Sequence, residues 1–443
     1  MNAHEVQQSL QVTAEEAVKT ASTLGADQVE AGVSYGEGLS VTVRMGELES
    51  VERQRDRSLA ITVYVGGCKG SASTAQFSSA AIKETARKAL SIASFTAKDQ
   101  YAGLADEQLM AQEFPDLDLY RPWELPVEAA EELARRTEDV ARATDKRIKN
   151  SEGASVSTGG GVQVYANSHG FCGGYATTNH SLSCGVIAES ENALERDYWL
   201  TVARNSDVLE TPEQVGAKAA HRTLRRLGAR QISTRQVPVV YPAELAAGLF
   251  GHFIGAIRGT SQYRKASFLL DACGDQIFPK FVDIDEDPFI PGAMGSAPFD
   301  DEGVATRPRK LIDSGVLQGY ILTSYSARRL GLQTTGNAGG VHNLVVKPTT
   351  GSLDQLLRDC PQVFLVGELL GQGVDMVSGD YSRGAAGFWV EHGEILFPVH
   401  EVTIAGNLKE LFHGIRAVGS DVDLRGTIRC GSVLVEGLTV AGH

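Results

Sequence analysis

The sequence contains an internal repeat, and this repeat limits the folds open to the chain more than any other feature. A shift of 123 positions superimposes one stretch on another and pairs like residues: Leu10 with Leu133, Ala31 with Ala154, Val33 with Val156, Gly36 with Gly159, Gly38 with Gly161 and Val41 with Val164. In both copies, apolar residues at helical spacing precede a segment in which apolar and polar residues alternate. The repeat therefore predicts two copies of one helix, antiparallel sheet and helix unit.

The first copy has recognisable boundaries. Its first helix places apolar residues on one face and ends at Gly25; these residues are Leu10, Ala14, Ala17, Ala21 and Leu24. Several antiparallel strands follow from Gln28, separated by glycine-containing breaks, and a second helix spans Ser79 to Ala93. The acidic, proline-bearing stretch from 101 to 126 then predicts a connection that crosses the surface.

The second copy ends in the clearest helix signal of the chain. Thr211 and Gln214 have the spacing of a capping box, Pro212 occupies the first helical position, and Gly228 supplies a stop. The remainder begins with a helix from Ala243 to Gly259 and contains a second helix that ends at Gly331. Most of the rest is short strands, including a hairpin that turns at His392 and Gly393. We therefore expect an α+β fold with domains at 1–118 and 119–235, the two repeats, and a β-rich C-terminal domain at 236–443.

Composition excludes several classes of function. The net charge of -14, with no dense basic cluster, argues against direct binding to nucleic acid. No apolar run is long enough to span a membrane, and the N-terminus lacks a secretion signal, so the sequence predicts a cytoplasmic protein with no membrane partner. The six cysteines are scattered without a CxxC pair, which predicts free thiols.

One histidine, His252, lies in the helix from Ala243 to Gly259 and raises the question of a metal site. A zinc hydrolase helix needs a second ligand about one turn away and a glutamate base nearby. Residues 247–257 contain no other His, Asp, Glu or Cys, and none of the ten histidines completes HExxH or HExxxH. We therefore predict that His252 is a structural, hydrogen-bonded histidine. It shares one side of the helix with Gly248, Gly255 and Gly259.

Three further stretches suggest chemistry but have simpler interpretations. GVSYG around Ser34 matches a nucleophile elbow, yet a strand follows where that device needs a helix. DIDED, from Asp283 to Asp287, lacks the glycine and the distal glutamate of a calcium loop, so we expect an exposed acidic turn. In PFDDEGV the adjacent carboxylates of Asp300, Asp301 and Glu302 are expected to diverge.

The glycine-rich stretch from Gly371 to Glu394 is the most unusual part of the chain. Asp380, Tyr381 and Arg383 stand among its glycines and precede a Phe-Trp pair. This polar trio could bind a peptide carboxylate or brace a tight turn, and the residues alone do not decide between the two.

Several long motifs together resemble one family. They are LFGHFIGAIRGTSQYRKASFLLD, PFDDEGVATRPRKLIDSGVLQGYILTSYSARRLG, TTGNAGGVHN, GDYSRGAAGFWVEHGEI and EVTIAGNLKELF. They resemble the PmbA (TldE) branch of the TldD/PmbA family over essentially the whole chain. The resemblance implies a cytoplasmic zinc metalloprotease system in which TldD-type and TldE-type subunits associate and act on small unfolded peptides.

The resemblance also implies how the work is divided between subunits. The TldD branch carries HExxxH, so zinc is expected in a TldD-type partner, and no catalytic residue, metal ligand or cofactor is assigned to this chain. We expect a heterodimer or higher assembly with that partner, or a homodimer when the chain is alone. The candidates for a peptide channel or interface are His252, Arg258, Asn337, His342, Asp380, Tyr381 and Arg383.

Two alternatives remain open at this stage. The chain could be a self-sufficient homodimeric metallopeptidase with a site that its motifs do not reveal. It could also be a non-enzymatic regulator that binds another protein, as the family label of DNA gyrase modulator suggests.

Overall fold

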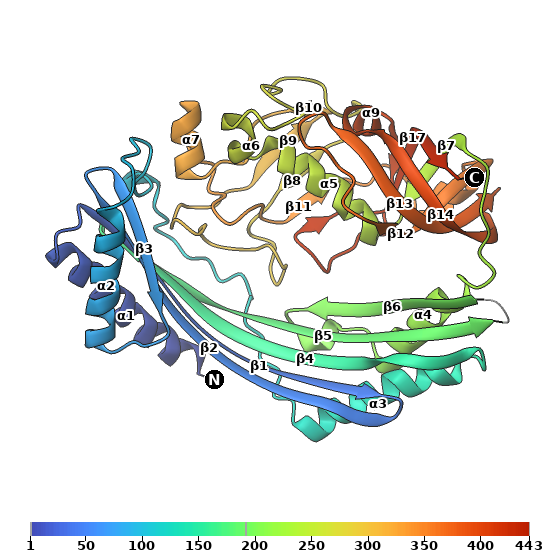
Figure 1. Ribbon diagram of the computed structural model, residues 1–443, viewed down its shortest axis with the longest axis horizontal. Coiled ribbons are helices and arrows are strands. Elements are labelled where there is room, and N and C mark those ends of the chain that lie inside the picture. Colours follow the sequence, from blue (N-terminus) through green and yellow to red (C-terminus); the bar gives the residue numbers. More distant parts are fainter. Residues whose placement is uncertain (1, 191–192, 443) are drawn as a thin grey trace.

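A computed structural model describes residues 2–190 and 193–442, and its first half is built around one long curved sheet (Figure 1). The strands of this sheet are β1 (Gln28–Arg44), β2 (Glu47–Val65), β3 (Cys68–Thr74), β4 (Ile148–Asn167), β5 (Cys172–Ser190) and β6 (Ala193–Ala203). Its helices are α1 (Ala3–Thr23), α2 (Ser79–Ala93), α3 (Val127–Ala143) and α4 (Pro212–Leu224). The strand order is β3-β2-β1-β4-β5-β6, so both repeats contribute to a single sheet.

The pairing of β1 with β4 reveals an internal two-fold symmetry. Val33 pairs with Val164, the repeat equivalent of Val41, and Val41 pairs with Val156, the repeat equivalent of Val33. The same exchange relates Gly36 and Gly38, which pair with Gly161 and Gly159. An approximate two-fold axis therefore passes between Glu37 and its partner Gly160. The predicted duplication is confirmed, and its two copies join edge to edge.

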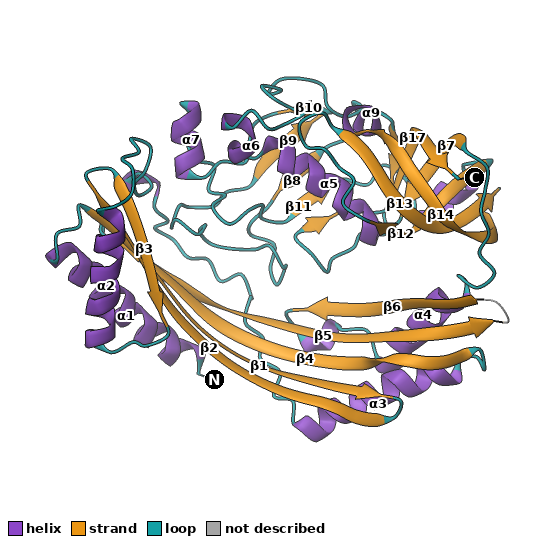
Figure 2. Cartoon of the chain, viewed as in Figure 1, coloured by secondary structure: helices purple, strands orange, loops and turns teal. Residues whose placement is uncertain are grey.

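The two faces of the sheet differ in chemistry. The apolar residues of the sheet pack under the helices in two separate cores, one around Ala17, Ile61 and Ala86 and the other around Val156, Ala134 and Ala219. Each core contains strand residues of both repeats, since Val164 belongs to the first core and Val41 to the second. The helices cover the convex face, and the C-terminal half of the chain faces the concave side (Figures 1 and 2). On the concave side the paired hydroxyls Ser40–Ser157 and Thr42–Ser155 lie 2.9 and 2.8 Å apart.

The predicted helices of the repeats are confirmed, whereas the strands are longer than expected. Gly36 and Gly38 do not break β1, which runs for 17 residues, because a glycine in a sheet leaves the ladder of backbone hydrogen bonds intact. The turns fall instead at Gly46 and at Gly66–Gly67, where φ is positive.

The capping box at the start of α4 is present. The Thr211 hydroxyl accepts from Gln214 N, and the Gln214 side chain accepts from Thr211 N at 2.9 Å. We expect Thr211→Ala to lower the free energy of unfolding by about 1 kcal/mol, because it leaves a helix N–H group without its acceptor. Urea denaturation would measure this loss, and Thr211→Ser, which keeps the hydroxyl, is the matched control; an equal loss in both variants would contradict the capping role.

The connection between the repeats does not keep to the surface, so that prediction is wrong for its middle part. Leu104, Met110, Leu117 and Leu119 are buried. The segment, which includes the short 3-10 helix Glu107–Leu109, runs between the sheet and the C-terminal half, where Ala111 N donates to Gly303 O at 2.9 Å. Its apolar side chains account for this path, because their burial stabilises the folded chain, whereas a linker on the surface would leave them in water.

The C-terminal half contains two sheets and is β-rich, as predicted. A five-stranded sheet consists of β8 (Ile284–Glu286), β9 (Arg309–Asp313), β10 (Val316–Leu317), β11 (Leu344–Val346) and β16 (Ile428–Arg429). The other sheet has the order β14-β13-β12-β7-β17-β15, and an additional pairing of β14 with β17 closes five of its strands into a ring. Its strands are β7 (Arg235–Tyr241), β12 (Gln362–Leu370), β13 (Asp380–Glu391), β14 (Glu394–Asn407), β15 (Ile415–Val418) and β17 (Val433–Ala441).

Short helices complete this half. They are α5 (Ala243–Ile257), α6 (Gly259–Tyr263), α7 (Ser324–Leu330), α8 (Leu353–Arg358) and α9 (Leu408–His413). In the first half, a 3-10 helix lies at Ser206–Val208, before α4. The predicted stop of α7 at Gly331 and the hairpin turn at His392 and Gly393 are both confirmed, with positive φ at all three residues. Among the described residues, no helix is long and apolar enough to cross a membrane.

Candidate functional site

Helix α5 carries His252, which is half-buried at the border of the helix's apolar face. Leu249, Phe250 and Phe253 are buried in the largest core of the chain. The His252 ring packs against the Tyr381 ring with centroids 6.2 Å apart, and burial together with the nearby Arg383 lowers the pKa of the imidazole. No described residue makes a hydrogen bond to this ring, so the structure does not show the hydrogen bond that we expected there.

The residues around His252 do not form a zinc site. The charged group that lowers the pKa of its imidazole, Arg383, is a cation, and zinc in proteins is held by His, Cys, Asp and Glu. Across residues 2–190 and 193–442, no three such side chains come together in a way that could hold a metal ion. The surroundings of His252 therefore do not fit the metal that the family implies.

Tyr381 and Arg383 fix the glycine-rich segment beside α5. Tyr381 is buried, and its hydroxyl lies near that of Tyr241, although the two form no hydrogen bond of good geometry. Burial raises the pKa of both phenol groups. Arg383 Nε donates to Leu370 O at 3.1 Å. Asp380 is exposed and accepts from the Ser378 hydroxyl at 2.8 Å, so it braces the turn that precedes β13.

A second polar group lies in the five-stranded sheet and was missed by the sequence analysis. The buried carboxylate of Glu286 accepts from Asn337 Nδ2, His342 N and Arg309 Nε, each at 2.7 Å. Arg309 also donates to Asn337 Oδ1 at 2.9 Å. Asn337 and His342 thus belong to one network of hydrogen bonds centred on Glu286. Arg258 lies beside Gly340, since its Nη2 is 3.9 Å from the position that a Cβ atom would take on that glycine.

The prediction of an exposed acidic turn at Asp283–Asp287 is therefore wrong. This segment contains β8, in which the alternating residues Ile284 and Glu286 point inward. Charge compensation by Arg309 makes the burial of Glu286 possible. The sequence signal was the alternation of aliphatic and acidic residues, but its arginine partner is 23 positions away.

The carboxylates of the PFDDEGV segment diverge as predicted. Asp300 is buried and accepts from the backbone N–H groups of Glu302, Val304 and Ala338 at 2.9, 3.0 and 2.9 Å. Burial raises its pKa to about 7, although these three hydrogen bonds act in the opposite direction. Glu302 instead accepts from Ser324 N at 2.9 Å, and Asp301 is exposed.

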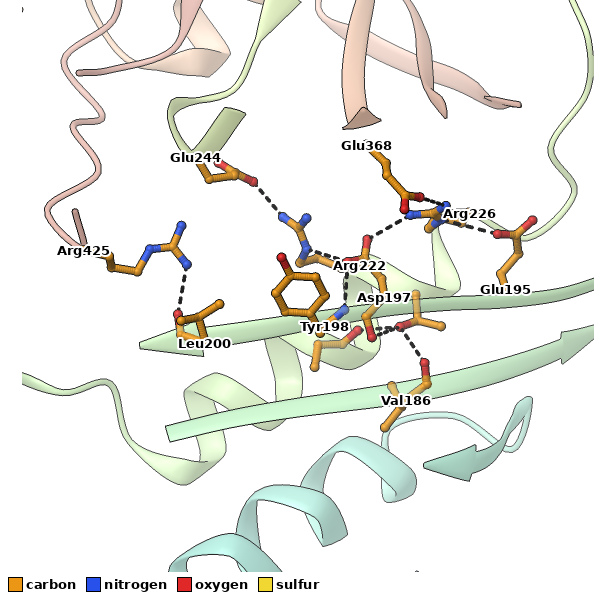
Figure 3. A network of polar contacts seen from close by, with 12 residues as sticks. Val186, Glu195, Asp197, Tyr198, Leu200, Arg222, Arg226, Glu244, Glu368 and Arg425 are labelled. Atoms are coloured by element: carbon orange, nitrogen blue, oxygen red, sulfur yellow. Dashed lines mark hydrogen bonds and ion pairs between the residues drawn. The ribbon is translucent and has the colours of Figure 1, made fainter. Parts of the chain in front are cut away.

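An ion-pair network joins the second repeat to the C-terminal half (Figure 3). Arg222 of α4 contacts Asp197 of β6 at 3.3 Å and Glu244 of α5 at 2.8 Å. Arg226, in the turn that follows α4, contacts Glu195 at 3.3 Å, Asp197 at 3.6 Å and also Glu368 of β12. Arg222 of α4 and Arg226 in the turn after it therefore hold α5 and β12 against the edge of the curved sheet.

We expect Arg226→Met to lower the free energy of unfolding by about 2 kcal/mol, because it leaves Glu368 unpaired and Asp197 with Arg222 as its one remaining cation. Urea denaturation measures this loss. Arg136→Met is the matched control on α3, since the Arg136–Glu213 pair is about half exposed and should contribute less than about 1 kcal/mol. Equal losses in the two variants would contradict a special role for the network.

Two cavities lie along the boundary that this network bridges. One, of about 610 Å³, is lined by residues of β6, α4, the start of α5 and the end of β12. The other, of about 720 Å³, is lined by the end of β6 and by the loops around Pro291 and Asp423. Both have the size of typical ligand sites. Of the seven residues singled out from the sequence, none lines either cavity.

Comparisons with known proteins match this architecture in order. The chain matches PmbA/TldA metallopeptidase domain 1 at residues 29–93, the central domain at 120–227 and the C-terminal domain at 234–442. It is 50% identical to metalloprotease PmbA of Escherichia coli O157:H7, covering 97% of this chain and 96% of that relative. It is 45% identical to the PmbA homologue of Haemophilus influenzae, covering 99% and 97% of the two chains.

Solved structures show the same fold. A Bacteroides thetaiotaomicron protein described as a candidate modulator of DNA gyrase superimposes with a TM-score of 0.93 at 27% identity, covering 97% of this chain and 98% of its own. TldE of Thermococcus kodakarensis superimposes with a TM-score of 0.86 at 20% identity, covering 97% and 99%, and supports the fold alone. Because the family's three domains match most of the chain and the relatives cover nearly all of it, the chain belongs to the PmbA/TldA metallopeptidase family, in its PmbA (TldE) branch.

Proposed function

We propose that this chain is the TldE-type subunit of a two-subunit zinc metalloprotease that processes or degrades small unfolded peptides. In this proposal a TldD-type partner supplies the zinc and the general base, and this chain supplies binding surface. The observation that supports the proposal is the environment of His252, which has a cationic neighbour and, within the described part of the chain, belongs to no group of three metal-binding side chains.

The physical reason is the chemistry of zinc hydrolysis. A zinc ion activates water by lowering its pKa, which requires several protein ligands and a nearby base. A single imidazole beside a guanidinium provides neither, and the guanidinium opposes the binding of a cation. The α5 helix then acts through packing, with Gly255 close to Met376 and Gly259 close to Ser326.

Co-purification and cleavage assays test this function. We expect the tagged chain to retain a TldD-type subunit from lysate, and the reconstituted pair to cleave an unstructured peptide while neither chain does so alone. His252→Ala in this chain should leave cleavage by the pair within about threefold of wild type, whereas loss of the partner's zinc-binding histidine should abolish it. A large loss of cleavage with His252→Ala would refute the proposal, and capture of gyrase without any TldD-type subunit would favour a regulatory function.

A further inference from the structure

A cavity lies on the convex face of the curved sheet, between the two groups of helices that cover this face. One group is α1 and α2, and the other is α3 and α4 (Figure 1). Along β1, Tyr35 packs against the first core and Leu39 against the second, and Glu37 lies between them on the same face. The floor of the cavity includes Glu37 and Leu39 of β1 and Thr158 of β4. Its volume of about 640 Å³ is that of a typical small-molecule site.

The duplication explains why the two sides of this cavity differ. In the second repeat, the connection at 119–125 covers β5, where Arg121 N donates to Thr178 Oγ1 at 2.9 Å and Thr178 is buried. The shift of 123 positions makes Arg55 of β2 the equivalent of Thr178, and the Arg55 side chain is 75% exposed. The first repeat therefore presents arginine to solvent at the place where the connection covers the second repeat.

Two arginines of β2, Arg53 and Arg55, form one wall of the cavity. They pair with Leu39 and Glu37 in the sheet, so their side chains lie on the convex face. Arg55 lies 3.8 Å from Glu37, which also accepts from the Tyr35 hydroxyl at 3.2 Å, so the charge of Glu37 is compensated. Arg53 makes no ion pair or hydrogen bond with any described residue. This wall thus offers a guanidinium group, which binds carboxylate and phosphate groups well.

The opposite wall is aromatic and consists mainly of Tyr120 and Trp123. The Trp123 ring packs edge-on against the His180 ring, with centroids 5.7 Å apart, and its indole N–H has no acceptor within the described part of the chain. Between the walls, Gly160 leaves the floor open, since a Cβ atom there would lie 3.4 Å from Tyr120 Cε2. Glu124 also lines this wall, but it is exposed to water.

We propose that this cavity binds a small molecule in which a flat aromatic ring carries a carboxylate or phosphate group. The ring lies against the wall that contains Trp123, and the anionic group accepts from Arg53. The C-terminal half, which carries His252, faces the concave side of the sheet, so this site is separate from the surroundings of His252 (Figure 1). The inference goes beyond the proposed function and does not depend on it.

Three naphthalene compounds that share one ring system test the site. Naphthoate and naphthyl phosphate distinguish the two anionic groups, and naphthalenemethanol carries no charge. By titration calorimetry at low ionic strength, we expect one site per chain for at least one of the anions, with affinity about tenfold or more above that of the alcohol. Arg53→Ala should weaken binding of the anion about fivefold or more and leave binding of the alcohol within about twofold of wild type.

The matched control is Arg307→Ala. Arg307 is an exposed arginine of the C-terminal half that likewise makes no ion pair or hydrogen bond with a described residue. Its removal changes the net charge as Arg53→Ala does, and affinity for the anion should stay within about twofold of wild type. Because Arg53 is also exposed, both variants should fold, which circular dichroism checks.

Nuclear magnetic resonance locates the bound molecule. The chain has three tryptophans, and Trp123→Phe identifies the indole N–H resonance of Trp123. This resonance should shift when the anion is added, whereas those of Trp199 and Trp389 should not. Anions that bind no more tightly than the alcohol, equal losses for Arg53→Ala and Arg307→Ala, an unchanged Trp123 resonance, or no measurable binding would overturn the inference.

Discussion

Arg309→Met should lower the free energy of unfolding by about 3–5 kcal/mol, among the largest effects expected of any substitution in this chain. Arg309 is the cation that compensates Glu286, whose side chain is 2% exposed. Its removal leaves a buried carboxylate with neutral donors only, from Asn337 and from the backbone of His342. Urea denaturation followed by circular dichroism measures the loss.

The double variant Glu286→Gln with Arg309→Met provides the control. Glutamine keeps an acceptor for Asn337 and His342 and carries no charge, so the double variant should recover about 1–2 kcal/mol relative to Arg309→Met alone. A single variant within about 1 kcal/mol of wild type, or a double variant less stable than the single one, would show that Glu286 does not depend on Arg309 for its burial.

The folded chain should lose stability as the pH rises from about 4 to about 7, through Asp300. The pKa of this carboxyl is about 7 in the folded chain, against an ordinary value of 3.8. The folded state therefore keeps a proton that the unfolded chain releases. The contribution of this group to the free energy of unfolding is complete below pH 3.8 and lost by about pH 7. A shift of this size corresponds to about 4 kcal/mol. Burial also raises the pKa of the neighbouring Glu302, which adds a change of the same sign.

Asp300→Asn isolates this contribution. The amide stays neutral, so the stability of the variant should vary less between pH 5 and pH 8 than that of wild type. Its NH₂ group cannot accept from Ala338 N, so the variant should be less stable than wild type at pH 5 by about 1 kcal/mol and should match or exceed it at pH 8. Thermal unfolding across this pH range measures both profiles. Parallel profiles would show that Asp300 does not titrate in this range.

The local architecture was predictable because its signals are short-range. The apolar spacing of α1, the limits of α2, the capping box of α4 and the stop at Gly331 each depend on residues within a few positions of one another. The duplication could also be predicted from the sequence. The sequence did not indicate, however, that the two copies share one sheet. That arrangement depends on the pairing of β1 with β4, a contact more than 100 positions apart that no local pattern encodes.

The candidate site was harder to predict, for the same physical reason. Asn337 and His342 were singled out, but the network that holds them depends on Glu286, which the sequence analysis placed in an exposed turn. The position of β6 at the edge of the curved sheet was not foreseen, because the neighbours of a strand are not known from its own sequence. That residues 247–257 offer His252 no second metal ligand could be read from the sequence, because two ligands on one helix must be close in sequence.

Elemental analysis of the isolated chain, combined with a peptide cleavage assay on the same sample, tests the central claim most directly. The account predicts far less than one zinc per chain and no cleavage, with zinc at about one per TldD-type subunit and chelator-sensitive cleavage once that partner is added. Stoichiometric zinc in the isolated chain, accompanied by cleavage that a chelator abolishes, would contradict it.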